Sequence, residues 1–445
     1  MQKDYNNDKL VVGLDIGTTK ICAIIGRMNE HNKLEILGIG KSTSEGVIRG
    51  MVMNINSTVD AITKAVKEAE LQAGVDVKVV NVGIAGQHIK SSMHRGSIMR
   101  TSNEDEISPA DVDRLTNDMY KTVMPYGSEI IHVMPQLYSV DYQEGIKDPV
   151  GMSGVRLEAD FHVITAQANA INNINKCILK AGLEIDKLIL EPIASSHSVL
   201  SEEEKEAGVV LVDIGGGTTD VAIFHDNIIR HTAVIPFGGN VVTNDIQQGC
   251  NVMLRDAELL KIKFGKALSN EASQNESVSI NGLRNRPPKE ISTIVLAHII
   301  QARMEEIIET VFVEIINSGY EGKLAGGIVV TGGGAQLQNI KQLFELVTGM
   351  DVRIGYPNEH LGKGKVEIVK SPMFATGVGL VLSGFTSIDD RDNKYSELIR
   401  TKETKTDKKA ESSKKTSKTF DLRLNNFQDK LKGFLAGDID DSNEY

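Results

Sequence analysis

The 445-residue sequence contains no tryptophan, only 4% aromatic residues and only three cysteines. Proteins that stack nucleic-acid bases need aromatic platforms, and proteins that hold a phosphate backbone need excess positive charge. This chain has a net charge of −11, so we expect no nucleic-acid partner. Cys22, Cys177 and Cys250 are far apart and form no CxxC pair, which argues against a disulfide framework or zinc site. Reduced thiols in a cytosolic protein are the simplest interpretation.

Long apolar segments are missing as well. No stretch approaches the roughly 18 apolar residues that a membrane-spanning helix needs, and the N-terminal MQKDYNNDKL has no apolar signal core. We therefore expect a cytoplasmic protein that does not cross a membrane, although it can still lie on one. The length predicts two or more domains, and 40% hydrophobic with 24% charged residues is typical of a soluble globular protein.

The sequence contains two similar glycine-bearing turns. Residues 9–26, KLVVGLDIGTTKICAIIG, predict a strand, a tight turn and a second strand, and residues 208–225, GVVLVDIGGGTTDVAIFH, repeat this unit. An internal repeat this far apart predicts two structurally related lobes. A third cluster, GGIVVTGGGAQL at 326–337, follows an apolar strand and precedes a predicted helix around 336–347. This alternation of strands and helices predicts α/β lobes.

The three turns offer what a nucleotide phosphate needs. Glycines let backbone N–H groups converge on an anion, threonines donate hydroxyl groups, and Lys20 supplies a point charge. Asp15 and Asp213 end their strands and suit Mg²⁺, held directly or through water. Ordinary hairpin turns also use Asp-Gly and Gly-Gly, but three such turns, two of them a matched pair, favour a nucleotide site. The predicted contacts are Asp15, Gly17, Thr18, Thr19, Lys20, Asp213, Gly215, Gly216, Gly217, Thr218, Thr219, Gly332, Gly333 and Gly334.

The motifs DIGTTK, DIGGGTTD and VVTGGGA, in this order, resemble the phosphate-1, phosphate-2 and adenosine motifs of the actin, sugar-kinase and heat-shock-chaperone ATPase superfamily. Within it, the chain resembles the FtsA family of bacterial cell-division proteins. The stretch DPVGMSGVRLEADFHVITA carries this choice, because it lies in the insertion by which that family differs from actin. Further family-like stretches are HVMPQLYSVD, LEPIASSHSVL and FATGVGL. The resemblance implies an actin-like α/β fold of two ribonuclease H-like lobes that binds ATP and Mg²⁺.

The resemblance also divides the chain into parts. It implies a first nucleotide lobe, an inserted FtsA-type subdomain, a second nucleotide lobe with a smaller domain on it, a disordered linker and a terminal membrane helix. The first lobe comprises residues 9–84, 166–206 and 369–385, and the inserted subdomain comprises 85–165. The second lobe comprises 207–243 and 323–368, and the smaller domain on it comprises 244–322. The linker is 386–419 and the terminal helix is 420–436.

Several further residues are candidates with an open alternative. In this family a helix with an acidic and a basic residue before a glycine touches the adenosine, which fits Glu258 and Lys261, although an ordinary ion pair explains them too. Gln167 is a candidate for orienting a water molecule, or else an exposed residue at a strand end. Glu191 and His197 are assigned to a packed segment between the lobes. Because no second substrate site is evident, we expect slow ATP hydrolysis or none.

The C-terminal region differs in composition. Residues 386–419 are polar and rich in Lys, Ser and Thr, which predicts disorder. On a helix, six large apolar residues of FDLRLNNFQDKLKGFLA at 420–436 fall within an arc of about 100°. Such a helix can pack on the protein's own core, but the linker does not enforce that, and lysines with aromatic anchors are typical of a membrane-surface helix. The six residues are Phe420, Leu424, Phe427, Leu431, Phe434 and Leu435.

These features together predict an adaptor rather than an enzyme with rapid turnover. The resemblance implies head-to-tail polymerisation on the cytoplasmic face of the cell membrane at the division site, anchoring of FtsZ filaments there, and recruitment of later division proteins. It also implies that the C-terminal tail peptide of FtsZ binds residues 244–322, with Arg303 as a candidate contact, unless Arg303 is merely solvated. The alternatives are a small-molecule kinase, a peptide-binding chaperone ATPase and a pilus-assembly relative of the same fold.

Overall fold

The computed structural model describes residues 9–100, 106–273, 275–281, 287–362 and 366–388. The predicted membrane helix at 420–436 and nearly all of the predicted linker lie outside the described residues. The chain divides into two compact units, Met1–Phe385 and Thr386–Tyr445, and the elements below belong to the first. Within the described part, no helix has both the length and the apolar character needed to span a membrane.

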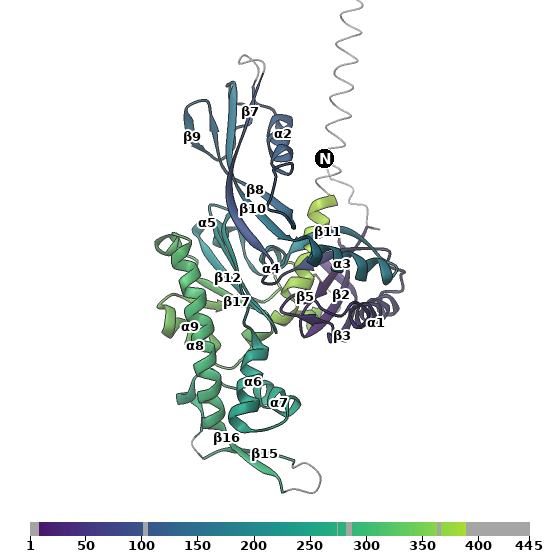
Figure 1. The fold of residues 1–445 in the computed structure, drawn as a ribbon, viewed down its shortest axis with the longest axis vertical. Coiled ribbons are helices and arrows are strands. Elements are labelled where there is room, and N and C mark those ends of the chain that lie inside the picture. Colours follow the sequence, from purple (N-terminus) through teal and green to yellow (C-terminus); the bar gives the residue numbers. More distant parts are fainter. Residues whose placement is uncertain (1–8, 101–105, 274, 282–286, 363–365, 389–445) are drawn as a thin grey trace, which may run out of the picture. The chain divides into compact units, whose positions relative to one another are not determined.

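The first lobe is built on a five-stranded sheet with the order β11-β6-β1-β2-β3 (Figure 1). The first three strands in sequence are antiparallel neighbours, β6 joins β1 in parallel, and β11 joins β6 in parallel. Helices α1 and α3 pack against each other, and α1 also packs on β2 and β3. The bounds are β1 Leu10–Ile16, β2 Lys20–Met28, β3 Leu34–Thr43, α1 Ile55–Ala73, β6 Val79–Ile84, α3 Ala168–Lys180 and β11 Glu184–Leu190.

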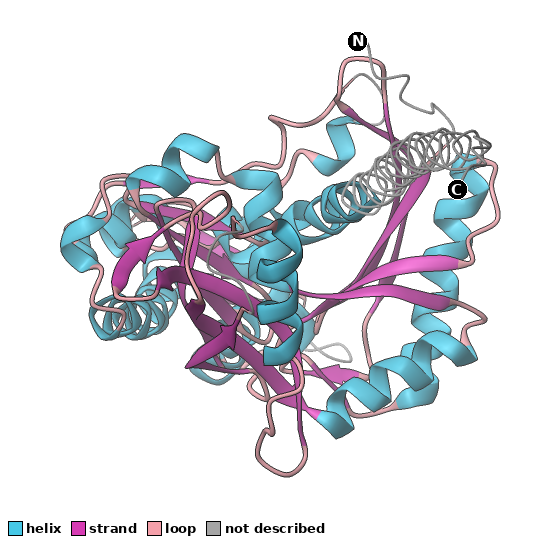
Figure 2. Cartoon of the chain, turned by 90° about the horizontal axis from the view of Figure 1, so that it is seen from above, coloured by secondary structure: helices cyan, strands magenta, loops and turns pink. Residues whose placement is uncertain are grey.

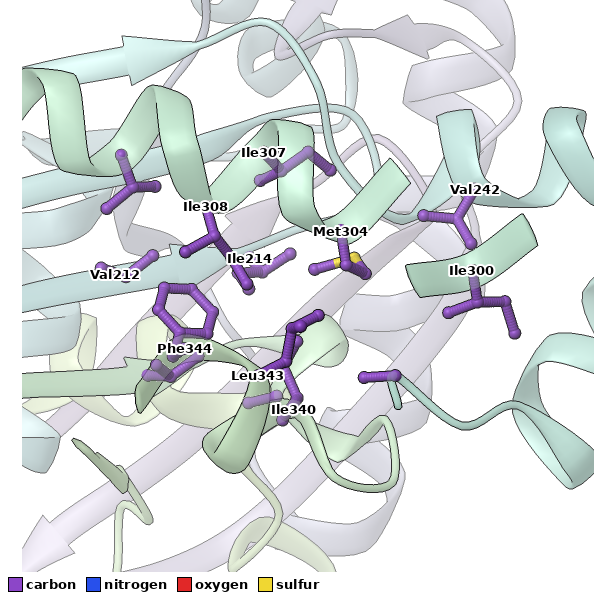
Figure 3. Close-up of a cluster of buried hydrophobic side chains, with 14 of the residues drawn as sticks. Val212, Ile214, Val242, Ile300, Met304, Ile307, Ile308, Ile340, Leu343 and Phe344 are labelled. Carbon is purple, nitrogen blue, oxygen red and sulfur yellow. The ribbon is translucent and has the colours of Figure 1, made fainter. Parts of the chain in front are cut away.

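The second lobe repeats this topology. Its sheet has the order β14-β13-β12-β17-β18, again three antiparallel strands followed by two parallel ones. In the apolar core shown in Figure 3, side chains of β12 meet those of α6, α8 and α9. The prediction of two related α/β lobes is confirmed. The bounds are β12 Val209–Ile214, β13 Thr219–His225, β14 Ile228–Ile235, α6 Gly239–Cys250, α8 Thr293–Asn317, β17 Ile328–Thr331, α9 Ile340–Thr348 and β18 Val352–Ile354.

The predicted inserted subdomain is confirmed as a separate sheet with the order β7-β10-β8-β9 and its own core around Phe161 and Leu157. Helix α2 begins with a capping box between Ser108 and Asp111, which explains the acidic start of that helix. Figure 2 shows the strands of the molecule in magenta with helices in cyan beside them. The bounds are β7 Lys90–Met99, α2 Pro109–Met119, β8 Ser128–Val140, β9 Gln143–Ile146 and β10 Arg156–Gln167.

One of the remaining elements corrects a prediction. The third glycine turn was expected to lead directly into a helix around 336–347, but it forms only the 3-10 turn η3. The α-helix begins at Ile340, because Asn339 takes a left-handed conformation with φ 64°. The other bounds are β4 Val47–Ile48, β5 Met51–Val52, α4 Glu191–Val199, α5 Glu202–Ala207, α7 Leu254–Phe264, η1 Ser269–Glu271, β15 Ser277–Ile280, β16 Lys289–Ser292, η2 Glu321–Lys323, η3 Gly333–Gln336, α10 Val366–Val369 and η4 Pro372–Phe374. Residues 375–388 are helical.

Candidate nucleotide site

The two aspartate- and glycine-bearing turns are hairpins of the same length. In each, the residue after the aspartate pairs with the residue five positions later. The first glycine of each turn donates its N–H to a carbonyl three residues on, from Gly17 to Lys20 at 3.1 Å and from Gly215 to Thr218 at 2.9 Å. The repeat that is visible in the sequence is therefore a repeat of individual backbone hydrogen bonds.

The structure places the two turns against each other. A methyl group on Gly216 would lie 1.8 Å from Thr19 Oγ1, and one on Gly217 would lie 2.6 Å from Thr18 Oγ1. Any side chain at these glycines would push the turns apart, so only glycine permits this approach. The threonine hydroxyls and glycine backbone of the two lobes thus form one continuous polar surface.

Charged side chains gather at the bases of both turns. Lys20 Nζ lies 2.9 Å from Asp15 Oδ2. Burial by itself lowers the pKa of Lys20, but Asp15, Cys22 and Asp213 together raise it overall, so Lys20 stays charged. Asp213 Oδ2 accepts hydrogen bonds from Ser195 Oγ at 2.7 Å and Thr376 Oγ1 at 3.2 Å. Burial raises the pKa of Asp213 despite these bonds.

Two further carboxyl groups, neither of them predicted from the sequence, belong to this cluster. Asp220 pairs with Asp213 across the second hairpin and is buried. Its Oδ2 accepts a bond from Thr218 Oγ1 at 3.1 Å, whereas Oδ1 is buried without a partner. Burial and then Asp213 raise the pKa of Asp220 to about 8. Asp220 could have been recognised from the equal lengths of the two turns. They place Thr218 at the position of Lys20 and Asp220 at the position of Cys22, which is opposite the strand-end aspartate.

The second group is Glu191, the first residue of α4, for which only a packing role between the lobes was expected. Helix α4 does pack between the sheets, against β6 and β11 of the first lobe and β12 and β13 of the second. Yet burial and then Asp15, Asp220 and Asp213 raise the pKa of Glu191 well above its ordinary value. Its place in the site could have been predicted from its position directly after β11, since the carboxyl ends of parallel strands meet at one edge of a sheet.

The third glycine turn lies beside the second hairpin. Gly332 has φ 84°, and a methyl group on it would lie 2.3 Å from Asp213 Oδ1. The first turn of α6 also meets this hairpin, because Gly239 N–H donates to Gly215 O at 2.9 Å and Asn240 N–H to Gly216 O at 2.8 Å. These contacts hold the second glycine turn rigidly.

The Glu258–Lys261 pair extends this surface. Lys261 Nζ lies 2.8 Å from Glu258 Oε2, donates to Gly239 O at 2.9 Å and to Thr243 Oγ1 at 2.7 Å. The ion pair that was the alternative explanation therefore exists, and it sits at the start of α6 next to the second turn. A contact with adenosine stays a prediction.

Two other predicted residues lie elsewhere. Gln167 is exposed at the end of β10, as the alternative anticipated, and its water-positioning role stays a prediction. Arg303, the candidate contact for the FtsZ tail peptide, is half-buried and not merely solvated, because its Nε lies 2.5 Å from Asp245 Oδ2 and it also pairs with Glu306. Its partner-binding role stays a prediction, and any acidic partner must compete with these two carboxylates.

The fold and the paired turns define an actin-like protein with duplicated lobes. Solved structures share this fold: the type IV pilus biogenesis complex PilM-PilN has a TM-score of 0.62 at 15% identity, with 84% of this chain and 98% of that chain covered. MreB5 of Spiroplasma citri bound to ADP has a TM-score of 0.52 at 16% identity, with 87% of this chain and 100% of that chain covered.

More specific matches identify the family. The model for "Cell division protein FtsA" matches residues 210–379, and that for the "SHS2 domain inserted in FTSA" matches residues 86–165. FtsA of Pseudomonas aeruginosa is 43% identical over 86% of this chain and 91% of its own length. FtsA of Escherichia coli strain K12 is 38% identical over 84% of this chain and 90% of its own length. The chain belongs to the FtsA family and is an actin-like cell-division protein, which confirms the predicted family over the alternatives.

Proposed function

We propose that the chain binds ATP with Mg²⁺ between the two glycine turns. The observation that carries this proposal is the direct apposition of the two hairpins, with Lys20 and two aspartates at their bases. The backbone N–H groups and threonine hydroxyls would hold the phosphates, and Lys20 would neutralise them. The described residues contain no cluster of three or more His, Cys, Asp or Glu side chains arranged to hold a metal. Asp15 and Asp213 would therefore hold Mg²⁺ mainly through water, as this ion prefers.

ATP in this site would act mainly as a latch between the lobes, with slow hydrolysis or none. Each lobe contributes one phosphate turn, so a nucleotide that contacts both favours the closed arrangement. The hydroxyl groups that bond Asp213 come from α4 and from the helical segment 375–388, and they join the base of the second hairpin to neighbouring elements. This arrangement supports a binding role without requiring fast turnover.

At the scale of the cell, the family supports an adaptor. We propose that the chain polymerises head to tail on the cytoplasmic face of the cell membrane at the division site, anchors FtsZ filaments there and helps recruit later division proteins. Residues 420–436 would adsorb to the lipid surface, with avidity from many copies. The FtsZ tail peptide would bind residues 244–322, near Arg303.

Co-sedimentation with lipid vesicles tests the anchor. The full chain should carry FtsZ to vesicles that contain anionic lipid, and the chain ending at residue 419 should leave both proteins in the supernatant. The sequence offers a matched pair of variants: Leu431→Asp lies on the apolar face of the predicted helix, whereas Leu422 is the leucine outside that face. Leu431→Asp should abolish binding and Leu422→Asp should retain it. If the truncated chain still carries FtsZ to vesicles, the anchor proposal is wrong.

A further inference from the structure

A small hairpin, β4–β5, lies outside both sheets and has a specific backbone shape. Ile48 pairs with Met51, which leaves Arg49 and Gly50 as its two-residue tip. Their φ angles are 49° and 74°, so both residues are left-handed, as in a type I′ turn. The hairpin is fixed at its base, where Met53 and Asn54 N–H groups both donate to Gly46 O.

The tip of this hairpin lies against both phosphate turns. Gly50 N–H donates to Thr18 Oγ1 at 3.1 Å, in the first turn. Ser44, just before the hairpin, donates its N–H to Thr19 O at 3.1 Å. A methyl group on Gly217, in the second turn, would lie 3.0 Å from Arg49 Cα. The tip therefore touches the two turns at the place where they face each other.

Arginine is an unexpected residue at this tip. Type I′ turns favour Asn-Gly, and a left-handed conformation costs a residue with a Cβ about 1–2 kcal/mol. Arg49 is exposed, and the ion pairs of the described residues do not include it. Arg49 therefore has a strained backbone and an unpaired guanidinium group beside the phosphate-binding turns. This combination indicates that its charge has a function there. Planar guanidinium groups bind phosphate oxygens in a bidentate manner.

The surroundings of the tip contain polar atoms that also lack partners. Ser44 Oγ and both ring nitrogens of His88 are buried without a hydrogen bond. His88 is near the tip, because a methyl group on Gly86 would lie 2.9 Å from His88 Nδ1 and 2.8 Å from Arg49 O. Buried polar atoms are normally satisfied, so this region is suited to receive a polar ligand or ordered water.

We propose that Arg49 binds the terminal phosphate of the nucleotide, so that the β4–β5 hairpin distinguishes a triphosphate from a diphosphate. This inference rests on the proposed ATP site.

The tip of the hairpin also contacts the segment that leads into the inserted domain. A methyl group on Gly50 would lie 2.4 Å from Ala85 O, so the tip packs on the segment that leads into β7 of the inserted domain. Movement of the tip with the terminal phosphate would thus reach the inserted domain through residues 85–89.

Titration with Mg-ATP and Mg-ADP tests the proposal. Arg49→Asn is the informative variant, because it removes the charge and leaves an Asn-Gly tip that fits the turn, so its melting temperature should match or exceed that of the wild type. It should weaken ATP binding by about tenfold or more, the value of a charge-assisted hydrogen bond, with ADP binding changed less than about twofold. Arg49→Lys should restore part of the ATP preference. Arg114→Ala, an exposed arginine of α2, should change neither affinity.

Each outcome separates this inference from the ATP site itself. Lys20→Ala should weaken both nucleotides, which establishes that the site is the one described. If Arg49→Asn keeps the wild-type ratio of ATP to ADP affinity while Lys20→Ala loses both, the ATP site stands and the role of Arg49 is wrong. If the wild type binds neither nucleotide, the ATP proposal fails, and the inference fails with it. Hydrogen exchange at residues 85–99 should differ between ATP and ADP in the wild type and not in Arg49→Asn. An unchanged difference in that variant would contradict the coupling.

Discussion

Single residues in the site illustrate how burial changes carboxyl chemistry. Asp15 and Lys20 form an ion pair at 2.9 Å. Burial and the charges of neighbouring carboxyl groups raise the pKa of Asp213, Asp220 and Glu191. A raised pKa favours the protonated carboxyl group, and Asp220, with a pKa of about 8, holds a proton at neutral pH. Incoming Mg²⁺ would compete with that proton, so binding of Mg-ATP should release protons near neutral pH.

One prediction concerns stability and pH without nucleotide or magnesium. The pKa of Asp220 rises from its ordinary 3.8 to about 8 in the fold, so the folded state holds a proton that the unfolded state has lost. The free energy of unfolding should therefore fall as pH rises from about 4 to about 8. Asp220→Asn, which cannot ionise, should remove part of this decline and raise the melting temperature at pH 8.

Thermal unfolding between pH 5 and pH 8 measures this effect. Asp76→Asn, an exposed aspartate, serves as the control and should keep the wild-type pH profile. Equal declines in Asp220→Asn and the wild type would show that Asp220 does not carry a proton in the folded protein.

Among the elements, α8 shows how one helix serves the second lobe. Its buried side chains, including Met304, Ile307 and Ile308, face β12 and α9 in the core of Figure 3. Ile316, two turns further along, is 49% exposed. The same helix thus provides a buried and an exposed isoleucine in the same local conformation.

These two isoleucines give a paired prediction. Ile308→Ala should lower the free energy of unfolding by about 2–5 kcal/mol, because it removes buried methyl groups and leaves a cavity. Ile316→Ala should change it by about 0.5 kcal/mol or less, since exposed substitutions rarely matter more. Urea unfolding followed by circular dichroism gives both values, and similar losses for the two variants would contradict the packing of α8.

For the whole molecule, the inserted domain connects the lobes. It enters and leaves through the first lobe, after β6 and before α3, yet its side chains bond β14, the edge strand of the second sheet. Gln136 Nε2 donates to Ile229 O at 2.8 Å, and Ser91 Oγ donates to Thr232 O at 3.1 Å. Lys147 Nζ lies 2.8 Å from Asp226 Oδ1 in the same region. The insertion therefore covers an edge that would otherwise present unpaired backbone groups.

A substitution of Gln136 tests whether the inserted domain stabilises β14. It is only 6% exposed, so Gln136→Ala should leave Ile229 O buried and unpaired and lower the free energy of unfolding by about 1–3 kcal/mol. Gln143→Ala, on the exposed strand β9, is the control and should have little effect. Hydrogen exchange should also quicken along β14 in Gln136→Ala. Unchanged exchange there would mean that the insertion does not stabilise this edge.

The sequence alone determined the features that are local in the chain. The DIGTTK and DIGGGTTD turns and the duplicated lobes were predictable, because turn chemistry and apolar periodicity act over neighbouring residues. The inserted domain was expected from the resemblance of its sequence to the FtsA family. The break before α9 was not, because it depends on one left-handed conformation, at Asn339.

Only the tertiary structure decided which distant residues meet. The hairpin spacing already places Asp220 opposite Asp213, whereas Glu191 joins Asp15 and Asp213 because two separate sheets bring their strand ends together. The same holds for Arg49, whose hairpin is distant in sequence from Gly217 but lies beside it in the fold. Local patterns specify elements, whereas the chemistry of the site depends on long-range packing, which brings together residues that are distant in the chain.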